Sequence, residues 1–529
     1  MSVVITALVI VAVIIFNIIF SALSQKFGWF IDLTKEGIYT LSDECVELLD
    51  DTFDKISEER KTAGEEPLKV NIIFCNLEDN LMASTTYRYV LMTAKELAEK
   101  FPDVVNIKYV NIWENPTAVD KYKTSVLSTI QASYVIIESG TEYRTYDISK
   151  FYLTNSNSTT PWAYFGEKRF ASGILAVTQA EAPVAAVLTG HGEVFPADTA
   201  IFDTLDLAGY EVIAVDDLVK AEIPDNCRLM VCYNPTSDFM DSKGISDVSE
   251  ISILNDFLAD NNHSFMVFMN PSSPKLPVLE SYLELWGISF MRDHNDGNYS
   301  PYTVKDPSHA LTSDGLTFIA EYEKLGLGGS ITKDIRSSST PRKVIFKNAM
   351  PIAIAEEYNI LHATEDGESL RYGYKDIGSG FARETYFIFN ASDDAVAMSG
   401  GREALKADSN NKLGLMTITR QQKLVQEDKY GISVADLSSY VIACGSTDFV
   451  SQQLIDSNTY GNSELLMKVF YEIGKENIPA SLPITPFSDT TIDTLTVDSA
   501  NSYTIALTVI PTVIIFGVGT YVIIRRRYS

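Results

Sequence analysis

The side chains of this sequence best placed to do chemistry are a histidine and a glutamate in VAAVLTGHGEVFPAD, residues 184–198. The apolar run VAAVL is typical of a buried strand, and the turn Gly190-His191-Gly192-Glu193 follows it almost directly. In an open α/β sheet, ligands bind at the carboxyl ends of the strands. The segment therefore predicts a pocket at this turn, but not by itself a reaction.

An acid/base pair of His191 and Glu193 would require the two side chains to converge. Alternate residues on an extended turn point to opposite sides, so we expect them to diverge. Amidotransferase chemistry also needs a nucleophile elbow, G-x-C-x-G or G-x-S-x-G, and the sequence has neither. Three interpretations stay open: a tight turn braced by His191 or Glu193, a site for a ligand or partner, or a part in catalysis.

Three further polar side chains follow apolar runs of the same kind. Asn270 ends SFMVFMN, and Ser446 and Asp448 follow SYVIAC. Since the carboxyl ends of parallel strands share one edge of a sheet, these residues join the candidate site for a ligand or partner. No H-E-x-x-H or comparable spacing occurs, so we predict neither a metal nor another cofactor. The other histidines are isolated in the sequence: His263, His294, His309 and His362.

Two other common chemistries lack their residues. The phosphate-binding pattern G-x-x-x-x-G-K-[ST] is absent, and the Gly-rich segment GLGGSITKD, residues 326–334, has the wrong spacing and lies in a region without regular periodicity. The five cysteines include no C-x-x-C, so redox catalysis is not expected. Cys75, Cys232 and Cys444 fall at the ends of apolar runs, where a cysteine usually behaves as a small buried hydrophobe. The sequence therefore predicts a protein that is not an enzyme.

The elements that position these residues fall into two α/β units. KVNIIFC, a helix over 85–101, VNIKYVNIW and SYVIIES follow the strand and helix order of a thioredoxin-like domain, which we place at residues 69–165. Residues 166–475 alternate continuous apolar strands with amphipathic helices, which indicates a doubly wound parallel sheet. Residues 291–385 lose this rhythm and are typical of a β-rich insertion.

Two long apolar stretches bound these units. Residues 3–23 and 505–524 contain no charged residue, and each is long enough to cross a bilayer core about 30 Å thick at about 1.5 Å per residue. A cleaved signal peptide is the alternative for the first stretch, but it lacks a basic n-region and its apolar run is too long. We therefore predict transmembrane helices within residues 1–24 and 503–529.

The orientation of these helices follows from their flanks. Arg525, Arg526 and Arg527 directly follow the second stretch, and short basic flanks stay in the cytoplasm. Two lysines shortly after the first stretch argue more weakly in the other direction. We predict a two-pass protein of the cell membrane, with both termini cytoplasmic and the large domain between them extracytoplasmic.

Two connecting segments join the units to the membrane. Residues 25–68 are expected to form a juxtamembrane helical segment, in which Ser42 precedes apolar positions at helical spacing and so resembles an N-cap. Residues 476–502 are rich in Pro, Ser and Thr and indicate an extended linker to the second span.

Charge and composition limit the partners. The chain has 42 Lys+Arg against 70 Asp+Glu and a net charge of -28 at pH 7. Such a surface repels phosphate backbones, so no nucleic-acid partner is expected. Within the spans, Asn17, Gly517 and Gly519 favour helix contacts in the lipid bilayer. The helix they contact belongs to a permease, to the other span, or to a second copy of the chain in a homo-oligomer.

The order of these segments resembles the GldG-type auxiliary components of ABC transporters, a family first associated with gliding motility. The resemblance covers nearly the whole chain, and it rests on DLTKEGIYTLSDE after the first apolar stretch, VLTGHGE before a helix ending in LAGYEV, the strand ends CYNP and FMNP, VIACGSTDFV and the final RRR. It implies a glutamine-amidotransferase-like fold without amidotransferase activity, partnered with a separate ATPase subunit and an ABC permease. Many relatives are fused to a six-helix permease, whereas only two spans are expected here.

The expected fold class is therefore α/β: a thioredoxin-like domain plus a glutamine-amidotransferase-like doubly wound sheet with a β-rich insertion, flanked by two transmembrane helices. The expected function is that of a membrane-anchored, non-catalytic accessory subunit that captures or gates the substrate of a bacterial ABC transporter. The alternative is an extracytoplasmic envelope receptor or carbohydrate-binding protein that acts without a transporter.

Overall fold

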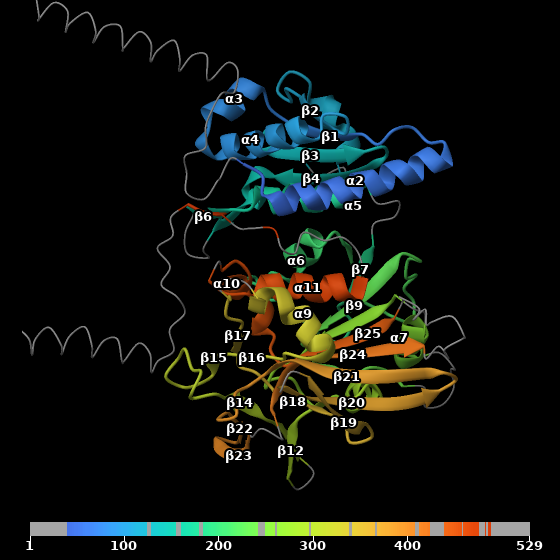
Figure 1. Cartoon of the computed structure of the whole chain (residues 1–529), viewed down its shortest axis with the longest axis vertical. Helices are drawn as coiled ribbons and strands as arrows, with labels where there is room; N and C mark the ends of the chain where they lie inside the picture. Colours follow the sequence, from blue (N-terminus) through green and yellow to red (C-terminus); the bar gives the residue numbers. More distant parts are fainter. Residues whose placement is uncertain are drawn as a thin grey trace, which may run out of the picture.

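The structure is a computed structural model, and it has a mixed α/β architecture of two stacked bodies (Figure 1). The residues it describes are 40–123, 129–154, 160–178, 183–241, 249–259, 262–295, 298–337, 341–365, 368–407, 412–423, 438–457, 459–474, 482 and 485–487. Both predicted membrane spans and the final arginines lie outside these residues. Within them, no helix combines the length and apolar character needed to cross a bilayer.

The first body is built on a four-stranded sheet in the order β2-β1-β3-β4. Strand β1 runs parallel to β2 and antiparallel to β3, and β4 forms a hairpin with β3. The first three of these strands lie in KVNIIFC, VNIKYVNIW and SYVIIES, where the sequence predicted strands. Their bounds are Val70–Phe74 (β1), Val105–Tyr109 (β2), Tyr134–Ser139 (β3) and Glu142–Asp147 (β4).

Three helices share one apolar core with this sheet: α2 (Asp43–Ala63), α4 (Thr85–Lys100) and α5 (Gly166–Thr178). Helix α2 starts at the predicted N-cap, because the Ser42 hydroxyl accepts a hydrogen bond from the Cys45 N–H at 3.3 Å. Helix α5 was expected to open the second unit. Its residues Phe170 and Ile174 instead lie in the core of the first sheet, because α5 packs on β3 and β4.

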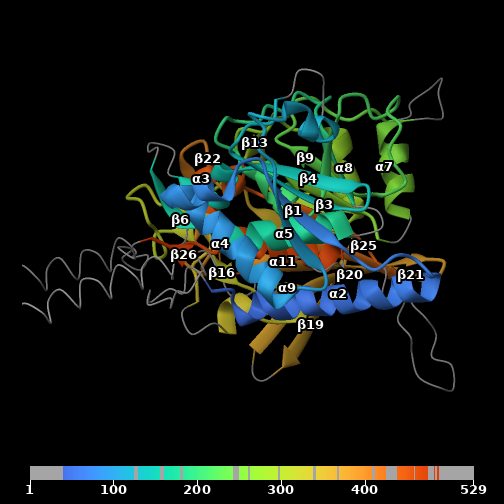
Figure 2. The same ribbon diagram turned by 90° about the horizontal axis from the view of Figure 1, so that it is seen from above.

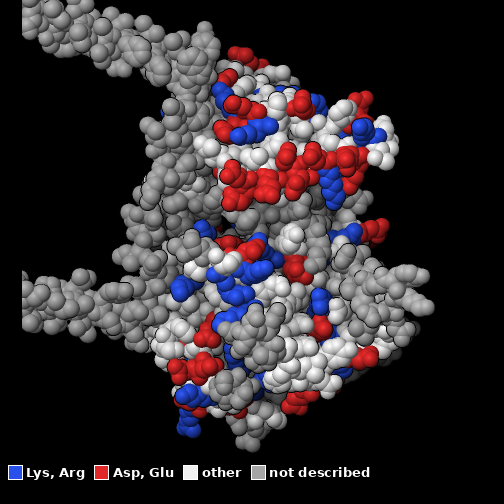
Figure 3. All heavy atoms as spheres, in the orientation of Figure 1, with Lys and Arg blue, Asp and Glu red and all other residues white. Residues whose placement is uncertain are grey.

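Short elements complete the first body. They are α3 (Glu78–Ala83), the 3-10 helices η1 (Pro116–Tyr122) and η2 (Ile148–Phe151), and strands β5 (Tyr152–Thr154) and β6 (Pro161–Tyr164). Figure 3 shows acidic side chains gathered over this body along α2. The exposed acids of that helix are Asp43, Glu44, Glu47, Asp50, Asp51, Asp54, Glu58 and Glu59.

The second body is built on a large sheet in the order β19-β20-β21-β24-β25-β10-β9-β7-β8. Neighbours from β25 to β8 run parallel to one another. Their bounds are Val184–Leu188 (β7), Glu211–Val215 (β8), Cys227–Tyr233 (β9), Ser264–Phe268 (β10) and Ser439–Cys444 (β25). The continuous apolar runs in the sequence therefore form a parallel sheet, as expected.

Helices cover both faces of these parallel strands. Ala185 and Val187 of β7 face a core shared with α6 (Ile201–Leu207), α9 (Gly326–Ser337) and α11 (Asn462–Gly474). Ala186 and Leu188 face a second core, shared with α7 (Glu250–Ala259) and α8 (Pro277–Leu285). Since alternate residues of β7 are buried on opposite faces, this strand is apolar at every position.

The predicted insertion is only partly separate from this sheet. Strands β19 (Asn359–Glu365), β20 (Glu368–Gly378), β21 (Phe381–Asn390) and β24 (Gly414–Lys423) continue the sheet beyond β25, each antiparallel to its neighbour. The segment 326–334 is also regular, because it forms most of α9. Local periodicity shows that a segment is a strand, but not which strand it pairs with.

The other elements of this body are short. Their bounds are Ile288–Phe290 (β11), Arg292–Asn295 (β12), Asn298–Pro301 (β13), Thr303–Lys305 (β14), Thr317–Ile319 (β15), Glu321–Tyr322 (β16), Ile345–Lys347 (β17), Ile352–Ile354 (β18), Val396–Ser399 (β22), Arg402–Lys406 (β23), Asp448–Val450 (η3) and Gln452–Ile455 (α10).

Part of the predicted linker is docked on the first body. Thr485–Pro486 forms β26, which pairs with β6. The Phe487 ring centroid lies 5.4 Å from that of Tyr89, and Leu482 is buried. These described residues of the predicted linker therefore contact the first body, with Leu482 in its core and Phe487 stacked at its surface.

The two bodies meet at α5. Figure 1 shows α5 above α6 and α11, Figure 2 shows it over α11 when seen from above, and α5 packs directly on α6. Arg169 of α5 and Asp206 of α6 form an ion pair across this junction, with 2.7 Å between Nη1 and Oδ2. The interface between the bodies is thus partly polar.

Candidate functional site

The turn Gly190–Glu193 follows β7 and is pressed against two neighbouring loops. A Cβ on Gly190 would lie 2.1 Å from the Asp216 carbonyl oxygen, and one on Gly192 would lie 2.2 Å from Thr236 Oγ1. Gly192 also has φ +75°, in the left-handed region that favours glycine. The two glycines are therefore required for this backbone path.

His191 and Glu193 converge, and the prediction that they diverge is wrong. Glu193 Oε2 accepts a hydrogen bond from the His191 backbone N–H at 2.6 Å, and Oε1 lies 3.3 Å from His191 Nδ1. The prediction assumed an extended turn. The left-handed conformation of Gly192 reverses the chain and brings both side chains to one side.

Two further residues close the pocket around His191. Glu250, at the start of α7, places Oε2 3.2 Å from His191 Nε2. The ring of Phe239 stacks on the imidazole with the centroids 3.8 Å apart. His191 is only 4% exposed, so the imidazole is enclosed by the protein on these sides.

The electrostatics of this cluster favour a protonated histidine. Burial works against the charge, but Glu193 and Glu250 outweigh it and raise the pKa of His191 above its ordinary value. Burial likewise opposes the charge on Glu193, and the hydrogen bonds from His191 nevertheless lower the pKa of that carboxyl. An imidazolium that faces a carboxylate at each nitrogen has no free lone pair with which to act as a general base.

The other candidate residues form a separate cluster. Asn270 Nδ2 donates a hydrogen bond to Thr447 Oγ1 at 2.6 Å, so the ends of β10 and β25 are tied together. The Ser446 hydroxyl donates to the Lys347 carbonyl at 2.5 Å. Asp448 Oδ1 lies 3.3 Å from Lys347 Nζ. Asn270, Ser446 and Asp448 are therefore brought close to one another.

The structure does not bring this cluster to His191, because β9 lies between β7 and β10. The loop that follows β9 contacts both groups. Its residues Thr236 and Ser237 donate backbone hydrogen bonds to the His191 carbonyl, and Asn234 Oδ1 accepts one from Ser273 beside Asn270. The carboxyl edge of the sheet thus holds two clusters whose polar atoms are satisfied largely within the protein.

Replacing Asn270 with alanine should destabilise the second body by about 1 to 2 kcal/mol, because the change removes the bond to Thr447 and leaves the Ser272 N–H without its acceptor. Urea unfolding monitored by tryptophan fluorescence measures the change. Ser272→Ala is the matched control, since it removes only the exposed hydroxyl that donates to Asn270 Oδ1 and leaves the bond between Asn270 and Thr447 in place. An equal loss in both variants would contradict a bracing role for Asn270.

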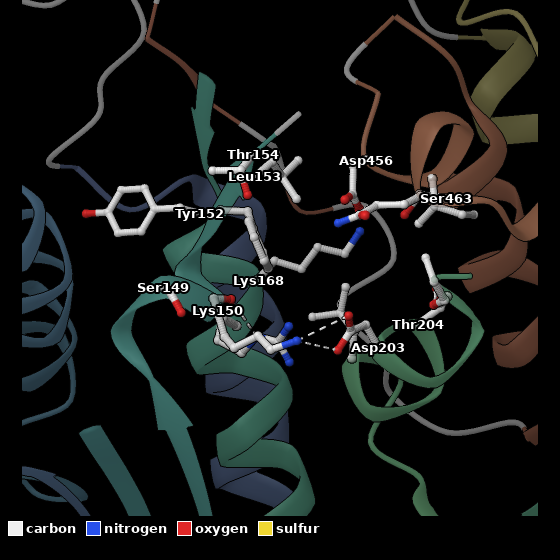
Figure 4. Close-up of a pocket in the computed structure, with 16 residues that line it drawn as sticks. Ser149, Lys150, Tyr152, Leu153, Thr154, Lys168, Asp203, Thr204, Asp456 and Ser463 are labelled. Carbon is white, nitrogen blue, oxygen red and sulfur yellow. Dashed lines mark hydrogen bonds and ion pairs between the residues drawn. The ribbon is translucent and has the colours of Figure 1, made fainter. Parts of the chain in front are cut away.

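The sequence interpretation missed a set of residues at the junction of the two bodies (Figure 4). A cavity of ≈ 250 Å³ lies there, and Lys168 of α5 reaches into it. Lys168 is 3% exposed. The signal was available in GEKRFASGILAVT, where two adjacent cations stand in a helix that is otherwise mostly apolar or small.

Within the described residues, no group of three or more His, Cys, Asp or Glu side chains is placed to hold a metal ion. We found no family model and no curated protein that matches the sequence. One solved structure that can be superposed is described as the mmIFT52 N-terminal domain. It has 11% sequence identity, and the match covers 56% of this chain and 99% of that one with a TM-score of 0.35, a likeness too loose to carry a conclusion about family or activity.

Proposed function

We propose that this chain is a membrane-anchored, non-catalytic accessory subunit of a bacterial ABC transporter, and that its two bodies capture or gate the substrate outside the cytoplasm. The proposal rests first on the sequence resemblance to the GldG-type auxiliary components. It also rests on the apolar stretches 3–23 and 505–524, which are long enough to anchor the chain at both ends. A separate ATPase subunit and a permease are the proposed partners.

The proposed fold is thioredoxin-like in the first body and amidotransferase-like in the second. The strand order β2-β1-β3-β4, with α5 following β4 and packed on the sheet, supports the first assignment. The parallel strands β25-β10-β9-β7-β8, with helices on both faces, support the second.

One observation carries the two-anchor arrangement: the first and last described segments are held at the same corner of the molecule. The Ser42 hydroxyl donates a hydrogen bond to Glu167 Oε2 at 2.6 Å. The Phe487 N–H donates to the Trp162 carbonyl at 3.0 Å. Trp162 and Glu167 are five positions apart, a span of at most about 18 Å. Two anchors that leave a body at one corner can enter the same bilayer side by side.

The closed state of the Gly190–Glu193 turn supports the absence of catalysis. His191 is buried, and both of its ring nitrogens face carboxylates of the protein. A catalytic acid or base must reach a substrate directly or through one water. The cluster instead ties the end of β7 to α7, which is a bracing role.

Isolation of the full chain from its native membrane in mild detergent tests the proposal. We expect mass spectrometry to find an ABC ATPase and a multi-span permease in fixed ratio with the chain. A variant with residues 505–524 exchanged for an unrelated apolar helix is the matched control, and it should remain in the membrane but lose the permease. Recovery of the intact chain alone would contradict the proposal and favour the receptor or carbohydrate-binding alternative.

A further inference from the structure

The cavity at the junction of the two bodies is lined from both sides. One wall comes from η2, β5 and α5, and the other from α6, α10 and the start of α11. Its volume of ≈ 250 Å³ corresponds to roughly eight water molecules at about 30 Å³ each. The residues that line it include the charged side chains of Lys150, Lys168, Asp203 and Asp456 and the hydroxyl of Ser463.

The cations of this cavity are not equivalent. Lys150 Nζ lies 2.9 Å from Asp203 Oδ1, and Arg169 is paired with Asp206. Lys168 is different, since no oxygen of the described residues accepts a hydrogen bond from its ammonium group. Figure 4 shows its side chain extending from α5 across the cavity, toward the side that carries Asp456 and Ser463.

The surroundings of Lys168 do not compensate its charge. Burial lowers the pKa of Lys168 to about 8, and the carboxylate of Glu464 only partly offsets this effect. Glu464 already has a cation nearby, because its Oε2 lies 3.8 Å from Arg342 Nη1. Arg342, Arg169 and Lys468 lower the pKa of Lys168 further. A buried charge is costly unless it is paired, and the described residues place no direct ion-pair partner beside this one.

We propose that this cavity binds the carboxylate of a small organic acid, with Lys168 as its ion-pair partner. The inference does not depend on the role in transport, because it rests on the cavity and on the unpaired lysine alone. The hydroxyls of Ser463 and Thr204, which also line the cavity, are the further donors for such a group.

The opposite wall favours a monoanion over a phosphate. Asp456 and Asp203 both line the cavity. Burial raises the pKa of Asp456 to about 6, with the Asp203 charge adding to the effect, so Asp456 is largely ionised at pH 7. Among the described residues that line the cavity, Lys168 is the cation without an ion-pair partner, so a dianionic phosphate would face this carboxylate with a single positive charge to balance it. A carboxylate carries one charge, which Lys168 alone can pair.

Thermal unfolding of the full chain in mild detergent tests the proposal. Tryptophan fluorescence follows the unfolding at pH 7 and constant ionic strength in the presence of sodium butyrate, phosphate or chloride. We expect butyrate at roughly ten times its Kd to raise the Tm by about 3 °C and the other two to leave it unchanged. Lys168→Met should abolish the rise. Lys150→Met, which removes a cation already paired in the same cavity, should preserve it.

A butyrate titration of the unmodified chain adds a measurement that needs no variant. Lys168 loses its proton between pH 7 and pH 9.5, whereas Asp456 is already largely ionised at pH 7, so the apparent affinity should fall about 30-fold over this range. An equal response of the unmodified chain and Lys168→Met would overturn the proposal. So would binding of phosphate in preference to butyrate, an affinity independent of pH, or no response to butyrate at all.

Discussion

Replacing His191 with alanine should destabilise the folded chain by about 3 kcal/mol, since removal of one partner from a buried ion pair leaves the other charge unpaired. The carboxylates of Glu193 and Glu250 would both lose the imidazolium and keep the backbone N–H donors of residue 191 and Met240, and Phe239 would lose a stacked ring. Urea unfolding of the full chain in mild detergent, with the variant and the parent side by side, measures the difference in the free energy of unfolding.

The pH dependence of this loss has a definite sign. The folded-state pKa of His191 is raised above its ordinary value of 6.5. A raised histidine pKa stabilises the fold fully at pH values below the unfolded pKa, and this contribution disappears as pH rises through the folded pKa. The difference between parent and His191→Ala should therefore be largest in mild acid and smaller in alkaline solution.

His294→Ala is the matched control, because His294 is exposed and stacks only on Tyr299, with the ring centroids 4.6 Å apart. Its expected effect is below about 0.5 kcal/mol. A His191→Ala variant that kept its stability but lost a measurable hydrolytic activity would contradict both the bracing role and the non-catalytic proposal.

Replacing Lys168 with methionine should stabilise the chain by about 3 kcal/mol at pH 7, in a buffer without carboxylates. Burial depresses the pKa of this lysine from 10.5 to about 8, and each pH unit of such a difference corresponds to about 1.4 kcal/mol. Methionine fills a similar volume without a charge to bury. Few substitutions of a charged residue are expected to raise stability by this amount.

The sign of the pH effect here is opposite to that for His191. Between pH 8 and pH 10.5 the unfolded chain binds the lysine proton and the folded chain does not, so the stability of the parent rises with pH. The advantage of Lys168→Met should be complete below pH 8 and vanish near pH 10.5. Parallel urea unfolding at pH 7 and at pH 10.5 measures it.

Lys150→Met serves as the comparison, because Lys150 is half-exposed and paired with Asp203. It should lose at most about 1 kcal/mol, with no gain at pH 7. A Lys168→Met variant less stable than the parent at pH 7 would mean that the ammonium is paired in the folded chain, and the carboxylate site would then have no basis.

Local sequence signals predicted the elements well. Strands β1 and β3 of the first sheet and the parallel strands of the second lie at short, mainly apolar runs of the sequence. Ser42 caps α2, as its place before a helical pattern predicted. Cys75, Cys232 and Cys444 are free and buried, as their positions at strand ends predicted. Each of these features depends on a few neighbouring residues, so sequence proximity is sufficient to reveal it.

Features that depend on distant residues were not predicted. The convergence of His191 and Glu193 follows from the backbone of Gly192, and its third member, Glu250, comes from α7. The extension of the large sheet by β19, β20, β21 and β24 depends on pairing between strands, about which alternation in one strand carries no information.

The sequence alone determined which segments are strands and helices, that the chain is strongly acidic, and that residues such as His191 and Lys168 are present. Only the tertiary structure decided the burial and the charged neighbours of these two residues. His191 became the centre of a closed ion cluster because two carboxylates fold around it. Lys168 became a buried charge because α6 packs on α5 and α10 and α11 line the far side of the cavity, while no described residue accepts a hydrogen bond from its ammonium group. The charge state of a buried group depends on its desolvation and on its neighbours, and both are set by packing between segments far apart in the chain.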